Sequence, residues 1–356
     1  MNNLINIIPN PDPLPVAAGW FQFLSHLTYY LHLISVGIMF SIAISMAVGY
    51  FKGKSEENWL GFGKEMGHLL PFTIAFAVNM GVAPLLFIQV LYGNFFYTSS
   101  TLIGTNWILL IVILILGYYA AYWISFRKSG NPGTKRFLSL FVSLVLAWTG
   151  FILVNVNTLM MRPAEWKSYF SHMGGFQLNT GDPSMLSRYI FYIFFLLAIG
   201  GLFIALYSKI KFGDKNSKPW IAYGSSLSGY SSFLTLPSLI LYMRVLPDNI
   251  SEVFVGGDTV WTIVSVFYFF GIIVTGYLAL KRKIVHASVV MGINLMIFVI
   301  LRDKVRSLFL EPFSEKFSTV GTNTQYGVMI LFFVTLVAGL GLIIWLLRKT
   351  YKELKG

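Results

Sequence analysis

The chain contains nine long apolar stretches, and its basic residues gather in every second gap between them. A helix needs roughly 20 predominantly apolar residues to cross the hydrocarbon layer of a membrane. The composition agrees with a membrane protein, because 56% of the residues are hydrophobic and 11% are charged. The pattern therefore predicts nine spanning helices, at 21–51, 67–92, 104–126, 136–161, 185–209, 219–244, 259–281, 284–302 and 325–348.

The basic residues also predict the orientation. Most of the 26 Lys and Arg follow the first, third, fifth, seventh and ninth stretches. By the positive-inside rule those gaps are cytoplasmic, so the N-terminus lies outside and the C-terminus inside. The same rule explains the net charge of +12, and nucleic-acid binding is not expected. We predict a multi-pass protein of the inner (plasma) membrane.

The domain organisation follows from these spans. Residues 1–20 form an outer lead-in broken by prolines, residues 21–350 form a single transmembrane domain, and residues 351–356 form a cytoplasmic tail. Two outer loops, 161–184 and 303–324, are long enough to fold locally. Residues 302–317, at the start of the second loop, read RDKVRSLFLEPFSEKF, with apolar and charged residues at helical spacing, which predicts a short helix on the membrane surface.

One spanning segment differs from the others. The stretch 219–244 contains five serines and one threonine between positions 225 and 235, followed by Pro237. A span that is polar on one side should turn that side toward protein rather than lipid. We therefore expect 219–244 to face neighbouring helices with its serine side.

Histidines and amides are the candidate site residues. His26 and His32 lie on the first span, about 9 Å apart along a helix and roughly 120° apart around it, so they cannot ligate one haem iron from opposite faces. His32 lies deeper, and an ionisable residue inside a span suggests a functional site. None of the carboxylates falls in a span centre; the deep polar groups are amides such as Gln89 and Asn157. Helix–helix hydrogen bonding is the alternative role for each amide.

Three segments resemble subunit I of the cytochrome bd quinol oxidases. They are YYLHLISVG (Tyr29–Gly37), GVAPLLFIQVLYGNFFYTSS (Gly81–Ser100) and FILVNVNTLMMRP (Phe151–Pro163), in which Asn157 and Pro163 keep the spacing of an Asn and a Pro in the family. The eighth span ends in Arg302, where the family has an outer loop that contains Arg. The resemblance implies two four-helix bundles plus a peripheral helix, with haem b and quinone as cofactors. It implies His32, or otherwise His26, as the ligand to haem iron.

The chain also departs from that family. Gln89 stands where the resemblance places an acidic haem-site residue, and the fifth and seventh spans lack the His and Met expected of a low-spin haem site. The outer loop after the sixth span is short, at 244–258. The chain has no cysteine, so it attaches no c-type haem and ligates no iron–sulfur cluster through thiolates.

These features predict a bd-type-like membrane subunit of a respiratory electron-transfer complex. It would interact with quinone or haem through His32, His26, Gln89 and Asn157. It would exchange electrons with partner subunits, such as a c-type cytochrome or an iron–sulfur protein on the outer side. Oxygen reduction by this chain is not expected. The alternative is a cofactor-free membrane anchor, or a transporter for a small uncharged solute.

Overall fold

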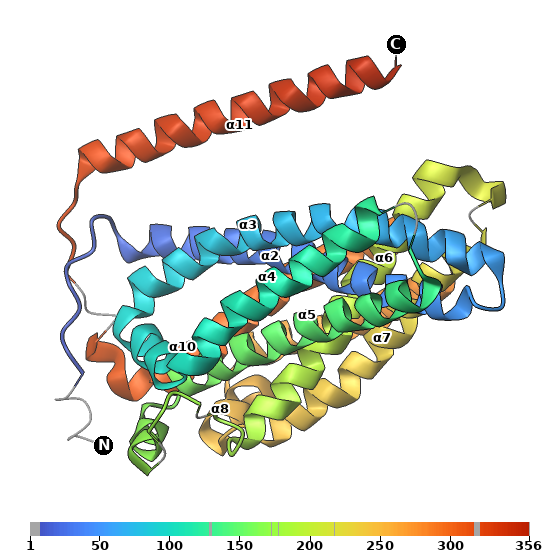
Figure 1. The fold of residues 1–356 in the computed structure, drawn as a ribbon. Helices are drawn as coiled ribbons and strands as arrows, with labels where there is room; N and C mark the ends of the chain where they lie inside the picture. The colour runs from blue at the N-terminus through green and yellow to red at the C-terminus, as the bar shows by residue number, and fades with distance from the viewer. Residues whose placement is uncertain are drawn as a thin grey trace.

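The computed structural model describes residues 8–127, 130–171, 173–176, 178–216, 218–316 and 321–355, which are almost entirely helical (Figure 1). The long helices are α2 (Ala18–Lys52), α3 (Glu57–Leu102), α4 (Gly104–Phe126), α5 (Pro132–Met160), α6 (Pro183–Asn216), α7 (Lys218–Arg244), α9 (Thr259–Leu280), α10 (Ile284–Leu310) and α11 (Tyr326–Lys355). The short elements are the 3-10 helices η1 (Pro163–Ser171) and η3 (Glu311–Lys316), α8 (Asp248–Glu252) and the π-helical turn η2 (Val253–Gly257). The predicted all-α polytopic fold is confirmed.

Within these residues, eight of the long helices are long and apolar enough to cross a membrane, and α7 is the exception. Its serines at 225, 228, 231 and 232 are buried, whereas Tyr230 and Leu234 on the same helix are exposed. The serine side therefore faces protein, as the sequence predicted. Small side chains bring α7 close to α6, because a Cβ on Gly201 would lie 2.6 Å from the backbone nitrogen of Ser228. Close approach of backbones at small residues is a common way for helices to pack in membranes.

The helices form the two expected bundles. Helices α2, α3, α4 and α5 pack together, and α6, α7, α9 and α10 pack together. The bundles meet mainly where α2 packs on α6. At this contact Gly200 faces the carbonyl oxygen of Gly37 and the side chain of Ser41, and a Cβ on Gly200 would clash with both. Glycine at this position lets α6 pack directly against α2, which brings the two bundles into contact.

Helix α11 is the predicted peripheral helix. It stands apart from both bundles in Figure 1, and most of its described apolar side chains are exposed. Its attachment lies at its N-terminal end, where Thr322 pairs with Leu14 in a β-bridge and Phe333 packs edge-on against Trp20 at 5.7 Å. In the described part of the lead-in, from residue 8 onward, Ile8 and Leu14 are buried. It ties α11 to the rest of the chain.

The prediction of a surface helix after the eighth span is wrong. Residues 303–310 continue α10 without a break, and in η3 the ring of Phe313 packs against Phe95 of α3. The reason is packing: Val305, Arg306, Leu310 and Phe313 are buried. Their helical spacing fits the interior of the protein and not a membrane surface.

Candidate cofactor site

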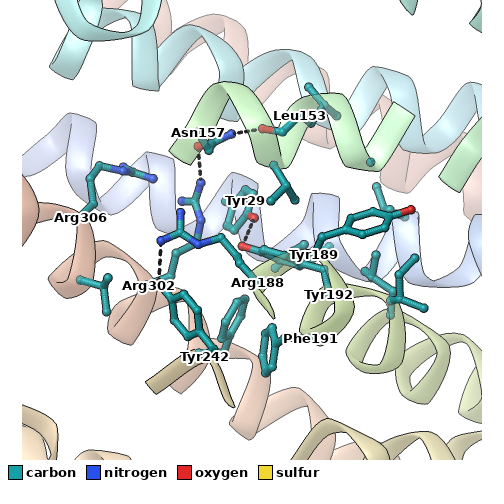
Figure 2. Close-up of a pocket in the computed structure, with 18 of the residues that line it drawn as sticks. Tyr29, Leu153, Asn157, Arg188, Tyr189, Phe191, Tyr192, Tyr242, Arg302 and Arg306 are labelled. Carbon is teal, nitrogen blue, oxygen red and sulfur yellow. Dashed lines mark hydrogen bonds between the residues drawn. The ribbon is translucent and has the colours of Figure 1, made fainter. Parts of the chain in front are cut away.

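A cavity of about 1230 Å³ lies between the two bundles, toward the end that the charge pattern predicts to be outer. Cofactor and ligand sites are typically mostly apolar with a few convergent polar groups, and this cavity has that character. Its polar lining includes one histidine, one amide, four arginines, five tyrosines, four serine or threonine hydroxyls and the two carboxylates Asp248 and Glu252. Figure 2 shows part of this lining, with side chains from α2, α5, α6, α7 and α10 converging.

His32 is held by the contact between α2 and α3. Its Nδ1 atom lies 3.1 Å from the carbonyl oxygen of Ala77. Because a carbonyl oxygen can only accept, Nδ1 must carry the proton, and Nε2 keeps its lone pair. Gly81 leaves room for the ring, since a Cβ there would lie 2.8 Å from the Cε1 atom of His32. Donation of Nδ1–H to a backbone carbonyl is the usual arrangement of a histidine that ligates a metal through Nε2.

Asn157 lies on α5 and joins the two bundles. Its Oδ1 atom accepts a hydrogen bond from Nη2 of Arg302 on α10 at 3.0 Å, and its Nδ2 atom donates to the carbonyl of Leu153 at 2.9 Å. The guanidinium of Arg302 also lies 4.1 Å from the centre of the Tyr29 ring, and the Tyr29 hydroxyl is 3.0 Å from that of Tyr192. Asn157 thus holds the guanidinium of Arg302 at the cavity wall.

A second arginine lines the cavity from α6. Arg188 is 9% exposed. Its Nη2 atom donates to the Tyr242 hydroxyl at 2.6 Å, and its Nη1 atom lies 3.9 Å from the sulfur of Met161. Both partners are uncharged. Arg188 therefore adds a buried positive charge to the same cavity.

Another arginine of the cavity wall, Arg306, is neutralised. Its Nη1 atom lies 3.0 Å from Oδ1 of Asp303, and the other oxygen of Asp303 lies 3.2 Å from Nε2 of His26. This group links α2 to α10 beside the cavity. His26 thus lies against Asp303 and does not point into the cavity.

The structure brings together two of the four predicted site residues. His32 and Asn157 line the cavity, whereas His26 and Gln89 are not among the described residues that line it. Among the described residues no group of three His, Cys, Asp or Glu side chains could hold a metal ion.

Sequence reasoning missed the arginines and tyrosines. Arg188 and Arg302 each lie near the end of a predicted span, where a basic residue is expected to indicate only the orientation of the chain. A signal was available for Arg302, since positions 302 and 306 share one face of a helix and that face is otherwise apolar. Nothing in the sequence indicates that Arg188 and Arg302 meet at one cavity.

A b-type haem fits these residues. It requires an apolar space, an axial ligand such as an imidazole nitrogen with a free lone pair, and cations for its two propionates. The cavity supplies the apolar space, and His32 supplies the imidazole nitrogen. Arg188 and Arg302, whose hydrogen-bond partners are uncharged, supply the cations. Within the bundle of α6, α7, α9 and α10, the space beside the cavity is filled by aromatic rings, those of Phe191, Phe195, Tyr268 and Phe298.

No known protein family is recognised in the sequence, and no curated protein sequence matches it. In three dimensions the chain is similar to the bd oxidase from Geobacillus thermodenitrificans, with a TM-score of 0.67 and 12% sequence identity. The match covers 93% of this chain and 98% of that one. The sequences share few residues, so the similarity is one of fold. This chain is a multi-pass membrane protein with the fold of a bd oxidase chain.

Proposed function

We propose that this chain is a membrane subunit of a bd-type-like respiratory electron-transfer complex and that it binds a b-type haem through Nε2 of His32. The observation that carries the proposal is the hydrogen bond from His32 to Ala77. It selects the tautomer that leaves Nε2 available, inside a cavity of sufficient size. A bound haem would supply one-electron transfer. The protein would orient the imidazole, keep the surroundings apolar and neutralise the propionates.

Membrane quinone is the proposed electron partner of the site. Val78 on α3 and Ile111 on α4 line the cavity and are also 48% and 55% exposed on the surface of the bundle. In a membrane that surface faces lipid or another subunit, so a lipid-soluble molecule can reach the cavity laterally. In a second form of the proposal, the cavity binds quinone and no haem. The same lateral opening supports it.

The remaining redox centres would belong to partner subunits. We propose a c-type cytochrome or an iron–sulfur protein on the outer side as the source or destination of electrons. This chain supplies no cysteine for either kind of centre. The exposed apolar helix α11 supports further subunits within the membrane, because its surface can pack against another spanning helix.

The test is an absorption spectrum of the protein extracted in mild detergent, before and after reduction. The proposal predicts a Soret band and reduced α band in the wild type and their loss in His32→Ala. His26→Gln is the matched control and should keep the spectrum, since His26 faces Asp303. Solvent extraction of the same sample tests for quinone, and mass spectrometry identifies partners. A wild-type protein with neither haem nor quinone would favour the cofactor-free anchor or transporter.

A further inference from the structure

We infer that the outer loop between α5 and α6 inserts apolar side chains into the outer leaflet of the membrane, close to the lipid headgroups. Three large side chains of this loop are exposed, those of Phe170 (75%), Met173 (73%) and Phe176 (64%), and we call them the apolar loop residues. In Figure 1 the loop lies at the same end of the bundles as the N-terminus. The inference goes beyond the proposed function, because none of the three residues lines the cavity.

The first argument is that hydrogen bonds hold the loop against the start of α4. The carbonyl oxygen of Gly175 accepts the backbone N–H of Thr105 at 3.0 Å, and the Thr105 hydroxyl donates to the carbonyl of Gly174 at 2.7 Å. The side-chain amide of Asn106 donates to the carbonyl of Phe176 at 3.0 Å. The first N–H groups of a helix have no partner within the helix, and here the loop supplies an acceptor. The loop therefore lies at the level of the first turn of α4.

The second argument is that the first turn of α4 lies at the edge of the membrane. Helix α4 is long and apolar enough to span it. Its next two turns expose Ile108 (65%) and Ile111 (55%), which in a membrane meet lipid or another subunit. Helix α6, which follows the loop, exposes Leu186 (56%) in its own first turn. The apolar loop residues thus lie at the level where the exposed apolar surface of the spanning helices begins.

The third argument is the composition of the loop. Trp166 packs inward, since its ring lies 6.2 Å from that of Phe95 and its Nε1 atom donates to the carbonyl of Leu159 at 3.1 Å. The apolar loop residues point outward instead, together with the exposed Glu165 and Lys167. Exposed apolar side chains that gather in one segment mark a contact site, and aromatic residues mixed with charged ones are typical of the membrane–water interface. Continuity with the lipid-facing surface of α4 favours lipid over a soluble partner.

The experiment measures the depth of the loop with nitroxide spin labels, because the chain has no native cysteine. Phe170→Cys and Phe176→Cys are labelled in the full chain, which is reconstituted in vesicles of phosphatidylcholine and phosphatidylglycerol. The relaxation of each label is compared in oxygen, which concentrates in the bilayer, and in a water-soluble nickel complex present on both sides. Ile108→Cys is the control for lipid, and Ser55→Cys, in the exposed turn between α2 and α3, is the control for water. Both loop labels should relax faster in oxygen than in the nickel complex, as Ile108→Cys does.

Two results would overturn the inference. Faster relaxation in the nickel complex, as at Ser55→Cys, would place the loop in water. Protection from both reagents would show that protein covers the loop, as expected of a docking site for an outer partner. The replaced side chains are exposed, so the labelled variants should fold as the wild type does. The readout needs neither haem nor quinone, and it is therefore independent of the test of the proposed function.

Discussion

The Nδ1 atom of His32 lies 3.1 Å from the carbonyl oxygen of Ala77, so the contact between α2 and α3 determines which imidazole nitrogen faces a ligand. A side-chain ligand held by backbone in this way needs no second side chain to orient it. The relationship makes the α2–α3 contact part of the candidate site. It also makes Gly81 a residue on which the site depends.

Gly81→Ala should disturb the site without touching any polar group. The new Cβ would lie 2.8 Å from Cε1 of His32, which forces the ring or the helix to move. We expect a shifted or weakened haem spectrum and a loss of about 1–3 kcal/mol in stability from overpacking. Gly61→Ala on the same helix is the control, since a Cβ added there would have no neighbouring atom within 4 Å. An unchanged spectrum in Gly81→Ala would count against His32 as the ligand.

Asp303→Asn should destabilise the protein more than His26→Gln. Arg306 is 3% exposed, and loss of the Asp303 carboxylate removes the negative charge that contacts its guanidinium. The expected cost is about 2–3 kcal/mol, measured by thermal unfolding in detergent. His26→Gln retains a hydrogen-bonding group and should cost less. The double variant Asp303→Leu, Arg306→Leu should recover stability relative to Asp303→Asn; a further loss would contradict this account.

Gly201→Leu should separate α6 from α7. Its side chain would meet the backbone of Ser228, which cannot yield as a flexible side chain can. We expect a strongly reduced yield of folded protein or a lower unfolding temperature. Gly339→Leu on α11 is the control, since nothing lies within 4 Å of that position. Equal stability of the two variants would show that α6 and α7 are not closely packed.

The orientation can be tested by labelling, because the chain has no native cysteine. Ser55→Cys lies in a gap predicted to be cytoplasmic, and Thr324→Cys precedes α11 on the predicted outer side; both positions are exposed. A membrane-impermeant maleimide should label Thr324→Cys in intact cells and Ser55→Cys only after permeabilisation. The reverse pattern would invert the topology.

Removal of residues 326–356 should separate partner binding from cofactor binding. Helix α11 contributes no residue to the cavity, and its apolar surface is exposed. The truncated protein should keep the haem spectrum of the full chain and lose co-purifying membrane subunits. Loss of the spectrum together with the partners would show that α11 supports the site.

Part of the site could be predicted from the sequence. His32 was singled out because an ionisable side chain deep in a span is costly, and Asn157 because of its depth and its spacing to Pro163. Arg188 and Arg302 were not predicted as residues of the cavity, since they lie near span ends, where basic residues are ordinary. The segment 303–310 was misassigned for a related reason: its amphipathic spacing is the same whether the apolar face meets lipid or protein.

The sequence by itself determined the helices, their number and their all-α character. Those properties follow from a local requirement, because each segment in lipid must satisfy its own backbone hydrogen bonds and match the membrane thickness. Only the tertiary structure decided which polar groups meet. Helix rotation and approach depend on packing at a few small residues, such as Gly81 against His32 and Gly200 against Gly37. That packing turns Arg302 toward Asn157 and His26 toward Asp303.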